Sequence, residues 1–191
     1  MSRERKVLLA LAETLDPLAV LKSHRIKPEE LSAILARAAQ FFGGEERTKG
    51  ARDDSLFTLF VDGASRGNPG PAGAGFVIRR GGKMVEGQAQ YLGRITSNQA
   101  EYNALLLGLR QALELGAARI EVISDSELMV RQMNGQYRVK HPALKPLFEK
   151  ARELSQKFKS FTIRHVPREQ NREADRLANR AIDEFSPSDR G

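Results

Sequence analysis

The segment that most constrains the fold of this chain is LFTLFVDGASRGNPGPAGAGFVI, residues 56–78. It begins with the apolar run Leu56–Val61, interrupted only by Thr58, which predicts a β-strand buried on both faces. The run stops at Asp62, whose carboxylate is costly to bury without a partner. A turn rich in glycine and proline then leads into a second strand, because glycine and asparagine accept positive φ and proline fixes φ. Such a turn has few side chains and lets a polymer backbone come close.

Three further acids follow Asp62 at wide intervals. Glu101 comes 39 residues later in TSNQAEYNALLLGL, Asp125 comes 24 after that at the end of ARIEVISD, and Asp175 comes another 50 on in REQNREADRLANRAID. Together with the VDGASRGNPG turn, the order and spacing of these acids resemble the type 1 ribonuclease H family over roughly two-thirds of the chain. The resemblance implies an α/β fold, a five-stranded mixed sheet with helices on both faces, and cleavage of RNA–DNA hybrids.

Each acid also has a purely structural explanation when it is taken alone. Glu101 could close a capping box that begins at Asn98, and Asp125 could cap the helix that follows it. Asp175 falls in the first turn of a predicted helix, where the helix dipole favours an acid, and Asp62 could simply end a strand. Taken together, two acids flank the apolar stripes of their helices and two close strands. If those strands are neighbours, the four carboxylates converge at one end of the sheet.

A cluster of four carboxylates has a chemical consequence. Like charges in a partly buried space raise one another's pKa values, and divalent cations remove that penalty. Oxygen ligands without a histidine or cysteine cluster favour Mg²⁺ or Mn²⁺ over zinc. The predicted chemistry is phosphodiester hydrolysis with two metal ions roughly 3.5–4 Å apart. By resemblance, Asp62, Glu101, Asp125 and Asp175 are the catalytic and metal-binding residues, with Asp62 bridging both ions.

An enzyme that cuts RNA only in a hybrid must sense the 2′-hydroxyl group through the minor groove. By resemblance, the substrate-binding residues near the metals are Ser65 and Asn68 in the turn and Thr96, Ser97 and Asn98 at the entry to the next helix. The alternative is that these residues serve only turn and cap chemistry. Glu127 stands where the family commonly carries glutamine, so the resemblance does not carry that residue's contact to a 2′-hydroxyl or base over to this chain.

The segment between the third acid and the last strand is compact and contains no tryptophan, unlike the basic protrusion of some family members. Basic residues still outnumber acids in it. We expect Arg138 and Lys140, with Lys145, to contact phosphates of the DNA strand. The alternative is an ordinary solvated helix face.

The family's mobile histidine has two candidate replacements in the short segment before Asp175. His165 lies inside the predicted strand FTIRHVP, where alternation places it with Phe161 and Ile163 on the core face. Arg168 sits at the predicted loop tip and resembles the arginine of compact family members. Its permanent charge suits a phosphate, although a guanidinium is a poor general base, so we assign Arg168 to the catalytic residues.

The net charge of the 191-residue chain is +7, of which residues 1–54 contribute +1 and residues 55–191 contribute +6. A basic surface around an acidic site suits a polyanionic substrate, although a merely soluble basic surface would look the same. The absence of cysteine excludes disulfides and thiolate metal sites. The N-terminus lacks the uninterrupted apolar run of a signal peptide or membrane span, so the expected location is the cytoplasm.

The expected organisation has four parts. Residues 1–42 read as three short helices, which fit either a helix-turn-helix or a small bundle that binds a protein or merely decorates the enzyme, so the candidate partner of these helices is a protein or a nucleic acid. Residues 43–55 read as a linker, residues 56–184 as the ribonuclease H catalytic domain, and residues 185–191 as a disordered tail. In the catalytic domain we expect strands near 56–61, 73–79, 83–91, 119–124 and 160–166, and helices near 98–115, 126–133, 143–158 and 171–183.

The function that this pattern favours is an endonuclease that hydrolyses the RNA strand of RNA–DNA hybrids, leaving 5′-phosphate and 3′-hydroxyl ends. Two alternatives remain open. One is a non-catalytic module that binds hybrids or double-stranded RNA, against which the four acids argue. The other is a different nuclease of the wider superfamily, such as a transposase or resolvase core, which the turn and the small size disfavour.

Overall fold

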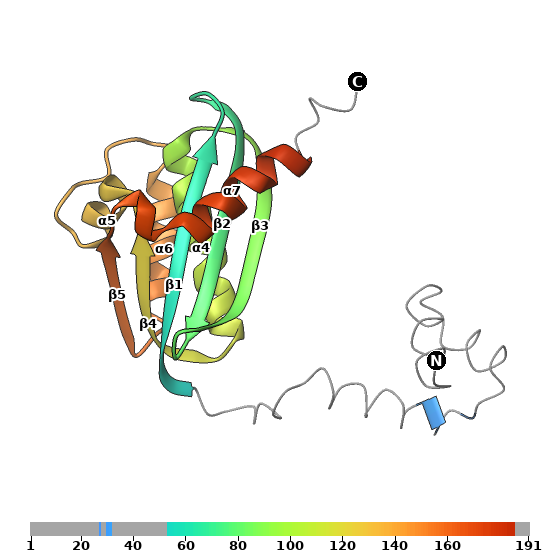
Figure 1. Ribbon diagram of the computed structural model, residues 1–191. Helices are drawn as coiled ribbons and strands as arrows, with labels where there is room; N and C mark the ends of the chain where they lie inside the picture. Colours follow the sequence, from blue (N-terminus) through green and yellow to red (C-terminus); the bar gives the residue numbers. More distant parts are fainter. Residues whose placement is uncertain (1–26, 28–29, 32–52, 186–191) are drawn as a thin grey trace. The chain divides into compact units, whose positions relative to one another are not determined.

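The computed structural model describes residues 27, 30–31 and 53–185 (Figure 1). The chain divides into two compact units, residues 1–51 and 52–191. In the first unit, Glu30 and Leu31 are helical, and the Leu31 N–H donates to the Lys27 carbonyl at 3.1 Å. The other predictions for residues 1–42, most of the predicted linker and the predicted tail from residue 186 onward lie outside the described residues.

The second unit alternates strands and helices largely as the sequence predicts. Its elements in chain order are β1 (Asp53–Ser65), β2 (Gly70–Arg80), β3 (Lys83–Ile95), α4 (Ser97–Glu114), β4 (Ala117–Ser124), α5 (Glu127–Met133), α6 (Lys145–Ser155), β5 (Ser160–His165), the 3₁₀ turn η1 (Arg168–Gln170) and α7 (Arg172–Phe185). β1 begins inside the range predicted as linker. None of these helices is long and apolar enough to cross a membrane.

The five strands form one mixed sheet in the order β3-β2-β1-β4-β5. β1, β2 and β3 are an antiparallel meander, and the β2–β3 hairpin turns at Gly81 and Gly82, whose φ angles are +56° and +78°. β4 pairs in parallel with both β1 and β5, as crossover helices require. The predicted fold class, with its meander and its parallel strands, is confirmed.

Helices cover both faces of the sheet (Figure 1). α7 packs across β2 and β1 on one face, and α4 packs on the other face with α6 beside it. The core on the α4 side contains Leu59 and Leu109, which are both fully buried. Burial of each leucine side chain contributes about 1.5–3 kcal/mol to the folding free energy, so this layer stabilises the packing of α4 against β1.

Two predictions for β1 are wrong. The strand is not buried on both faces, because Leu56 is 46% exposed and Thr58 and Phe60 are only partly buried. The face that carries Thr58 and Phe60 is covered by α7, whose contacts lie mainly over β2. The strand also does not end at Asp62, because pairing with β2 continues to Ser65.

Candidate active site

Asp62 and Asp125 meet where the parallel pairing of β1 with β4 stops. The last paired residues are Phe60 and Ile123, and each acid lies two residues further along its own chain segment. Asp62 is only 5% exposed, and its side chain shares a hydrogen bond with the side chain of Asp125. The end of the parallel ladder therefore brings two carboxyl groups into contact, as the sequence predicts for neighbouring strands.

Glu101 reaches the same place from α4, because Gly63 lets the helix backbone lie directly against β1. A Cβ atom added at Gly63 would come within 2.1 Å of the Glu101 nitrogen. The Gly63 N–H donates to the Glu101 carboxylate, while the buried Oε2 atom of Glu101 has no hydrogen-bond partner. One oxygen of this carboxylate is thus held by the backbone, and the other is a buried acceptor without a donor.

The capping explanations for Glu101 and Asp125 are wrong. The capping box of α4 uses Thr96 and Gln99, two residues earlier than predicted, so Glu101 lies inside the helix. α5 begins at Glu127 with Ser126 as its cap residue, and Asp125 lies before that cap. Neither acid is needed to start its helix.

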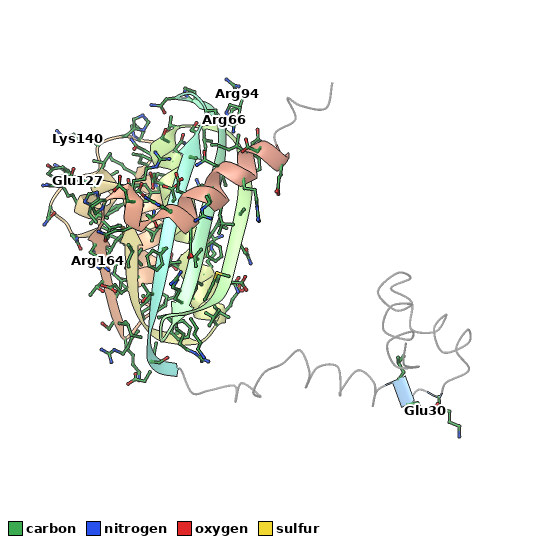
Figure 2. All side chains as sticks on the ribbon, viewed as in Figure 1. Glu30, Arg66, Arg94, Glu127, Lys140 and Arg164 are labelled. Atoms are coloured by element: carbon green, nitrogen blue, oxygen red, sulfur yellow. The ribbon has the colours of Figure 1, made fainter. Side chains whose placement is uncertain are left out.

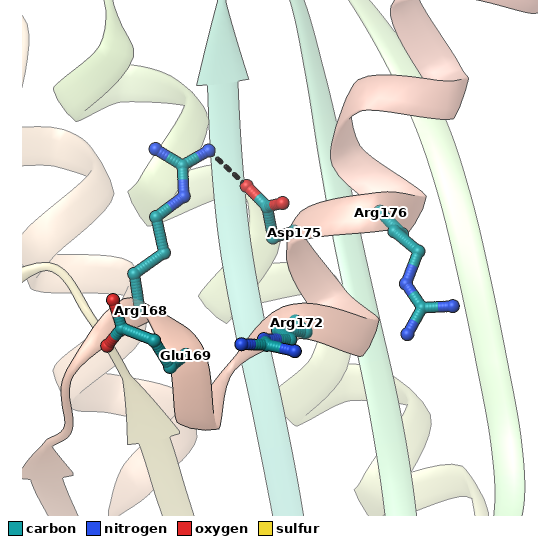
Figure 3. Close-up of a pocket in the computed structure, with 5 residues that line it drawn as sticks. All are labelled: Arg168, Glu169, Arg172, Asp175 and Arg176. Atoms are coloured by element: carbon teal, nitrogen blue, oxygen red, sulfur yellow. Dashed lines mark hydrogen bonds and ion pairs between the residues drawn. The ribbon is translucent and has the colours of Figure 1, made fainter.

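Asp175 comes from the first turn of α7, on the opposite face of the sheet from α4. Glycines again permit the close approach, because a Cβ atom at Gly75 would meet the Ala174 carbonyl oxygen at 2.4 Å, and one at Gly73 would meet the Ala178 carbonyl oxygen at 2.3 Å. The Arg168 guanidinium donates to Asp175 Oδ1, as Figure 3 shows. Asp175 thus closes the cluster from the α7 layer and carries a cationic partner.

Asn171 is a functional candidate that the sequence analysis missed. It is 1% exposed, and its Nδ2 atom donates to Asp125 Oδ1 at 2.7 Å and to the Val61 carbonyl at 2.9 Å. Its own carbonyl accepts from the Asp175 N–H at 3.1 Å. One residue therefore connects β1, the end of β4 and the start of α7. Its position just before a helix would have suggested only a helix cap.

The cluster is electrostatically strained. Burial raises the pKa of Asp62 from 3.8 to about 7, and the negative charges of Asp125 and Asp175 contribute to the rise. The pKa of Glu101 is also raised, first by burial and then by the charges of Asp62 and Asp125. Arg168 opposes both shifts. Positive charge placed among these oxygens would stabilise them all.

The donor set suits hard divalent cations. All four side chains offer oxygen, the chain has no cysteine, and Glu101 Oε2 is a buried acceptor without a donor. In the described part of the chain, however, no three or more histidine, aspartate or glutamate side chains stand in an arrangement that could hold a metal ion. Arg168 forms an ion pair with Asp175, so its positive charge offsets part of the negative charge of the four carboxylates.

The predicted substrate-binding residues of the turn and of the α4 start lie together. Ser65 Oγ has one proton to donate and lies within hydrogen-bond distance of the Gly67 carbonyl of the turn, at 2.6 Å, and of the Ile95 carbonyl, at 2.9 Å. Asn68 Oδ1 accepts from the Ser97 N–H at 3.3 Å, which joins the turn to the helix. Thr96 caps α4, and Asn98 is exposed beside it. Ser65 and Thr96 therefore have structural partners, whereas the side chain of Asn98 forms no hydrogen bond with another described residue.

The other predicted contacts come from different elements. Arg138 and Lys140 are exposed in the segment between α5 and α6, and Figure 2 shows Lys140 and Glu127 on the same side of the domain. The Glu127 carboxylate forms an ion pair with Arg131 at 2.6 Å. No hydrogen bond or ion pair links Arg138 or Lys140 to the four acids within the described residues.

The prediction for His165 is wrong. His165 is exposed, although Ile163 is buried and Phe161 is partly buried on the same predicted face. The reason is that β5 is the outermost strand and His165 is its last residue, paired with Ser124 at the end of β4. Arg168, with a side chain 68% exposed, lies in η1 and reaches Asp175.

Comparisons with known proteins relate this chain to a described family and to curated relatives. The family described as reverse transcriptase-like matches residues 60–181. The "Bifunctional protein Rv2228c" of Mycobacterium tuberculosis is 45% identical over 67% of this chain and 36% of its own length. "Ribonuclease HI" of Halobacterium salinarum is 44% identical over 65% of this chain and 63% of its own length. The chain thus spans less than two thirds of these curated relatives.

Solved structures resemble the second unit closely. The crystal structure of RNase H1 from Halobacterium salinarum is 43% identical and covers 68% of this chain and 98% of that one, with a TM-score of 0.66. The structure of LC11-RNase H1 in complex with RNA/DNA hybrid is 41% identical and covers 67% of this chain and 97% of that one, with a TM-score of 0.64.

Proposed function

The chain belongs to the type 1 ribonuclease H family, and from this premise we propose that it is an endonuclease that cuts the RNA strand of RNA–DNA hybrids. The observation that carries the proposal is that Asp62, which forms a hydrogen bond with Asp125, also interacts electrostatically with Asp175 and Glu101, so that acids from four parts of the chain act on one another. The solved complex of the similar LC11 protein with an RNA/DNA hybrid supports the choice of substrate.

The four acids, Asp62, Glu101, Asp125 and Asp175, are the residues that would hold two Mg²⁺ or Mn²⁺ ions. When bound, such a pair supplies an activated water and stabilises the 3′-oxygen that leaves, which gives 5′-phosphate and 3′-hydroxyl products. The chain's own contribution is preorganisation. Asn171 holds Asp125 against β1, and the Gly63 N–H fixes one oxygen of Glu101, so two of the four carboxylates are positioned by the chain's own hydrogen bonds.

Recognition of the hybrid is assigned to the turn and the α4 start. Asn68 uses its Oδ1 on the Ser97 N–H, which leaves its Nδ2 group as a donor for a 2′-hydroxyl. Ser97 and Asn98 offer further short polar groups, while Ser65 and Thr96 keep the turn and the helix start in shape. Arg138 and Lys140 supply positive charge for the DNA strand, as phosphate contacts position a duplex without reading its sequence.

We assign Arg168 an electrostatic role, in which its positive charge stabilises the scissile phosphate. Its guanidinium pairs with Asp175, and this hydrogen bond raises the pKa of Arg168 further above its ordinary value. It therefore stays protonated and acts as a counterion for phosphate or product, not as a base.

One gel assay tests the function. The full chain is incubated with the same labelled RNA in hybrid, double-stranded and single-stranded form, with Mg²⁺, with Mn²⁺ and with EDTA. We expect internal cuts in the RNA of the hybrid only, and only when metal is present. The products should carry 5′-phosphate groups that a phosphatase removes. A non-catalytic binding module would retard the hybrid without cutting it, and cleavage of all three forms would indicate a different nuclease.

A further inference from the structure

Arg168, Arg172 and Arg176 form an arginine row beside the active site. Together with Glu169 and Asp175 they line an open pocket of about 380 Å³ (Figure 3). The three arginines follow one another at intervals of four residues, and one such step along a helix rises about 6 Å. All three are exposed. The row therefore begins at Arg168 in η1, where it pairs with Asp175, and continues with Arg172 and Arg176 along the exposed surface of α7.

The charges around α7 leave two of these arginines uncompensated. Every acid of α7 has a basic partner: Glu173 pairs with Arg79, Asp175 with Arg168, Asp183 with Arg66 and Glu184 with Arg180. Arg172 and Arg176 form no ion pair with another described residue. Glu169 is the one other acid in the pocket, so the lining keeps an excess of positive charge.

We propose that Arg172 and Arg176 bind a backbone phosphate of the strand that is cut, next to the scissile phosphate. This inference rests on the proposed function, because it takes Asp175 as the neighbour of the scissile bond. When the scissile phosphate lies next to Asp175, the next phosphate of the same strand falls in the adjoining pocket, which Asp175 and the arginines line together. Guanidinium groups bind phosphate oxygens with paired hydrogen bonds, and a pocket open to solvent admits a chain that enters and leaves.

The salt dependence of hybrid binding tests the proposal. Binding of a labelled hybrid to the full chain is measured by fluorescence anisotropy in EDTA, between about 50 and 200 mM salt. We expect Arg172→Gln/Arg176→Gln to weaken binding and to reduce the slope of log K against log salt by roughly 0.7–0.9 for each phosphate that the variant no longer binds. Exposed substitutions of this kind leave stability within about 0.5 kcal/mol, which thermal unfolding verifies.

The matched control is Arg110→Gln/Arg119→Gln, which removes the same charge elsewhere. Arg110 lies nine residues after Glu101 on α4, Arg119 lies near the start of β4, and both are exposed. If the α7 variant and this control change the slope equally, only net charge matters and the pocket proposal is wrong. The proposed function fails separately, if the wild-type chain does not cut the hybrid in the gel assay.

A second measurement assigns the strand. Hybrids that carry one neutral methylphosphonate at successive positions are compared between the wild-type chain and the α7 variant. We expect a single position in the cut strand where the neutral group weakens wild-type binding but not that of the variant. Coupling at a position in the DNA strand, or at none, would overturn the assignment.

Discussion

Replacing Gly63 by alanine is the most direct test of how the fold builds the site. The added Cβ atom would lie 2.1 Å from the Glu101 nitrogen and 2.2 Å from the Ala100 carbonyl carbon. Both are backbone atoms, so no side chain can rotate away. An ordinary contact begins at 3.4 Å, so the start of α4 must move away from β1 by about 1.3 Å.

That displacement acts on stability and on catalysis. Overpacking a close contact costs roughly 1–3 kcal/mol in unfolding free energy. The same movement separates Glu101 from Asp62 and weakens the Gly63 N–H bond to its carboxylate. Since misplacing a catalytic group by about 1 Å can cost 100-fold in rate, we expect hybrid cleavage to fall by about that factor.

The assay combines urea unfolding with the initial rate of hybrid cleavage at saturating Mg²⁺. The control is Gly87→Ala on β3, where the added Cβ atom would have no neighbour nearer than 3.7 Å. We expect that variant to resemble the wild type in both measurements. If Gly63→Ala matches Gly87→Ala in stability and rate, the close approach of α4 to β1 does not position Glu101.

Four other predictions follow from the site and the domain order. Asp125→Asn should abolish cleavage without loss of stability, because the amide oxygen can still accept from Asn171; substantial remaining turnover would make Asp125 a structural acid. In EDTA the unfolding free energy, measured by urea unfolding, should fall as the pH rises from about 4 to about 7. The reason is that Asp62 has a pKa of 3.8 when unfolded and about 7 when folded, so the folded state keeps a proton that the unfolded chain has lost. Mg²⁺ should restore the lost stability at pH 7, and an unfolding free energy that does not change with pH would argue against the carboxylate cluster. Arg168→Ala should slow turnover and change stability by no more than about 1 kcal/mol, since its ion pair is exposed, whereas His165→Ala should change neither quantity; the opposite result would move the catalytic role to the histidine. A chain that begins near Asp53 should fold and cut hybrids, and an insoluble product would show that the preceding residues complete the core.

The sequence predicted the parts of the fold that depend on local pattern. The hairpin at Gly81 and Gly82, the meander and the parallel strands follow from turn chemistry and from helices between strands. Asp62 and Asp125 were predicted to meet because both follow apolar strands. The prediction needed only that the two strands are neighbours.

Other features depend on contacts between distant residues. Asn171 acts through the Val61 carbonyl, 110 residues away, and no local pattern marks that pairing. His165 follows the alternation of a core strand, yet the strand is the outermost one of the sheet, so alternation did not predict burial. The cap of α4 is Thr96, two residues before Asn98, and this shift removes the capping alternative for Glu101 and leaves its assignment to the site as a prediction.

The contact of Gly73 and Gly75 with α7 limits how this protein can be engineered for heat resistance. Replacing glycine by alanine often stabilises a protein by about 0.4–1 kcal/mol, because the unfolded chain loses freedom. Alanine at either position would push away α7, the helix that carries Asp175. A substitution chosen to raise stability would therefore lower the rate of cleavage. Exposed apolar residues on the edge strand β3, Met84 and Val85, are safer starting points, since polar replacements there also discourage aggregation between sheet edges.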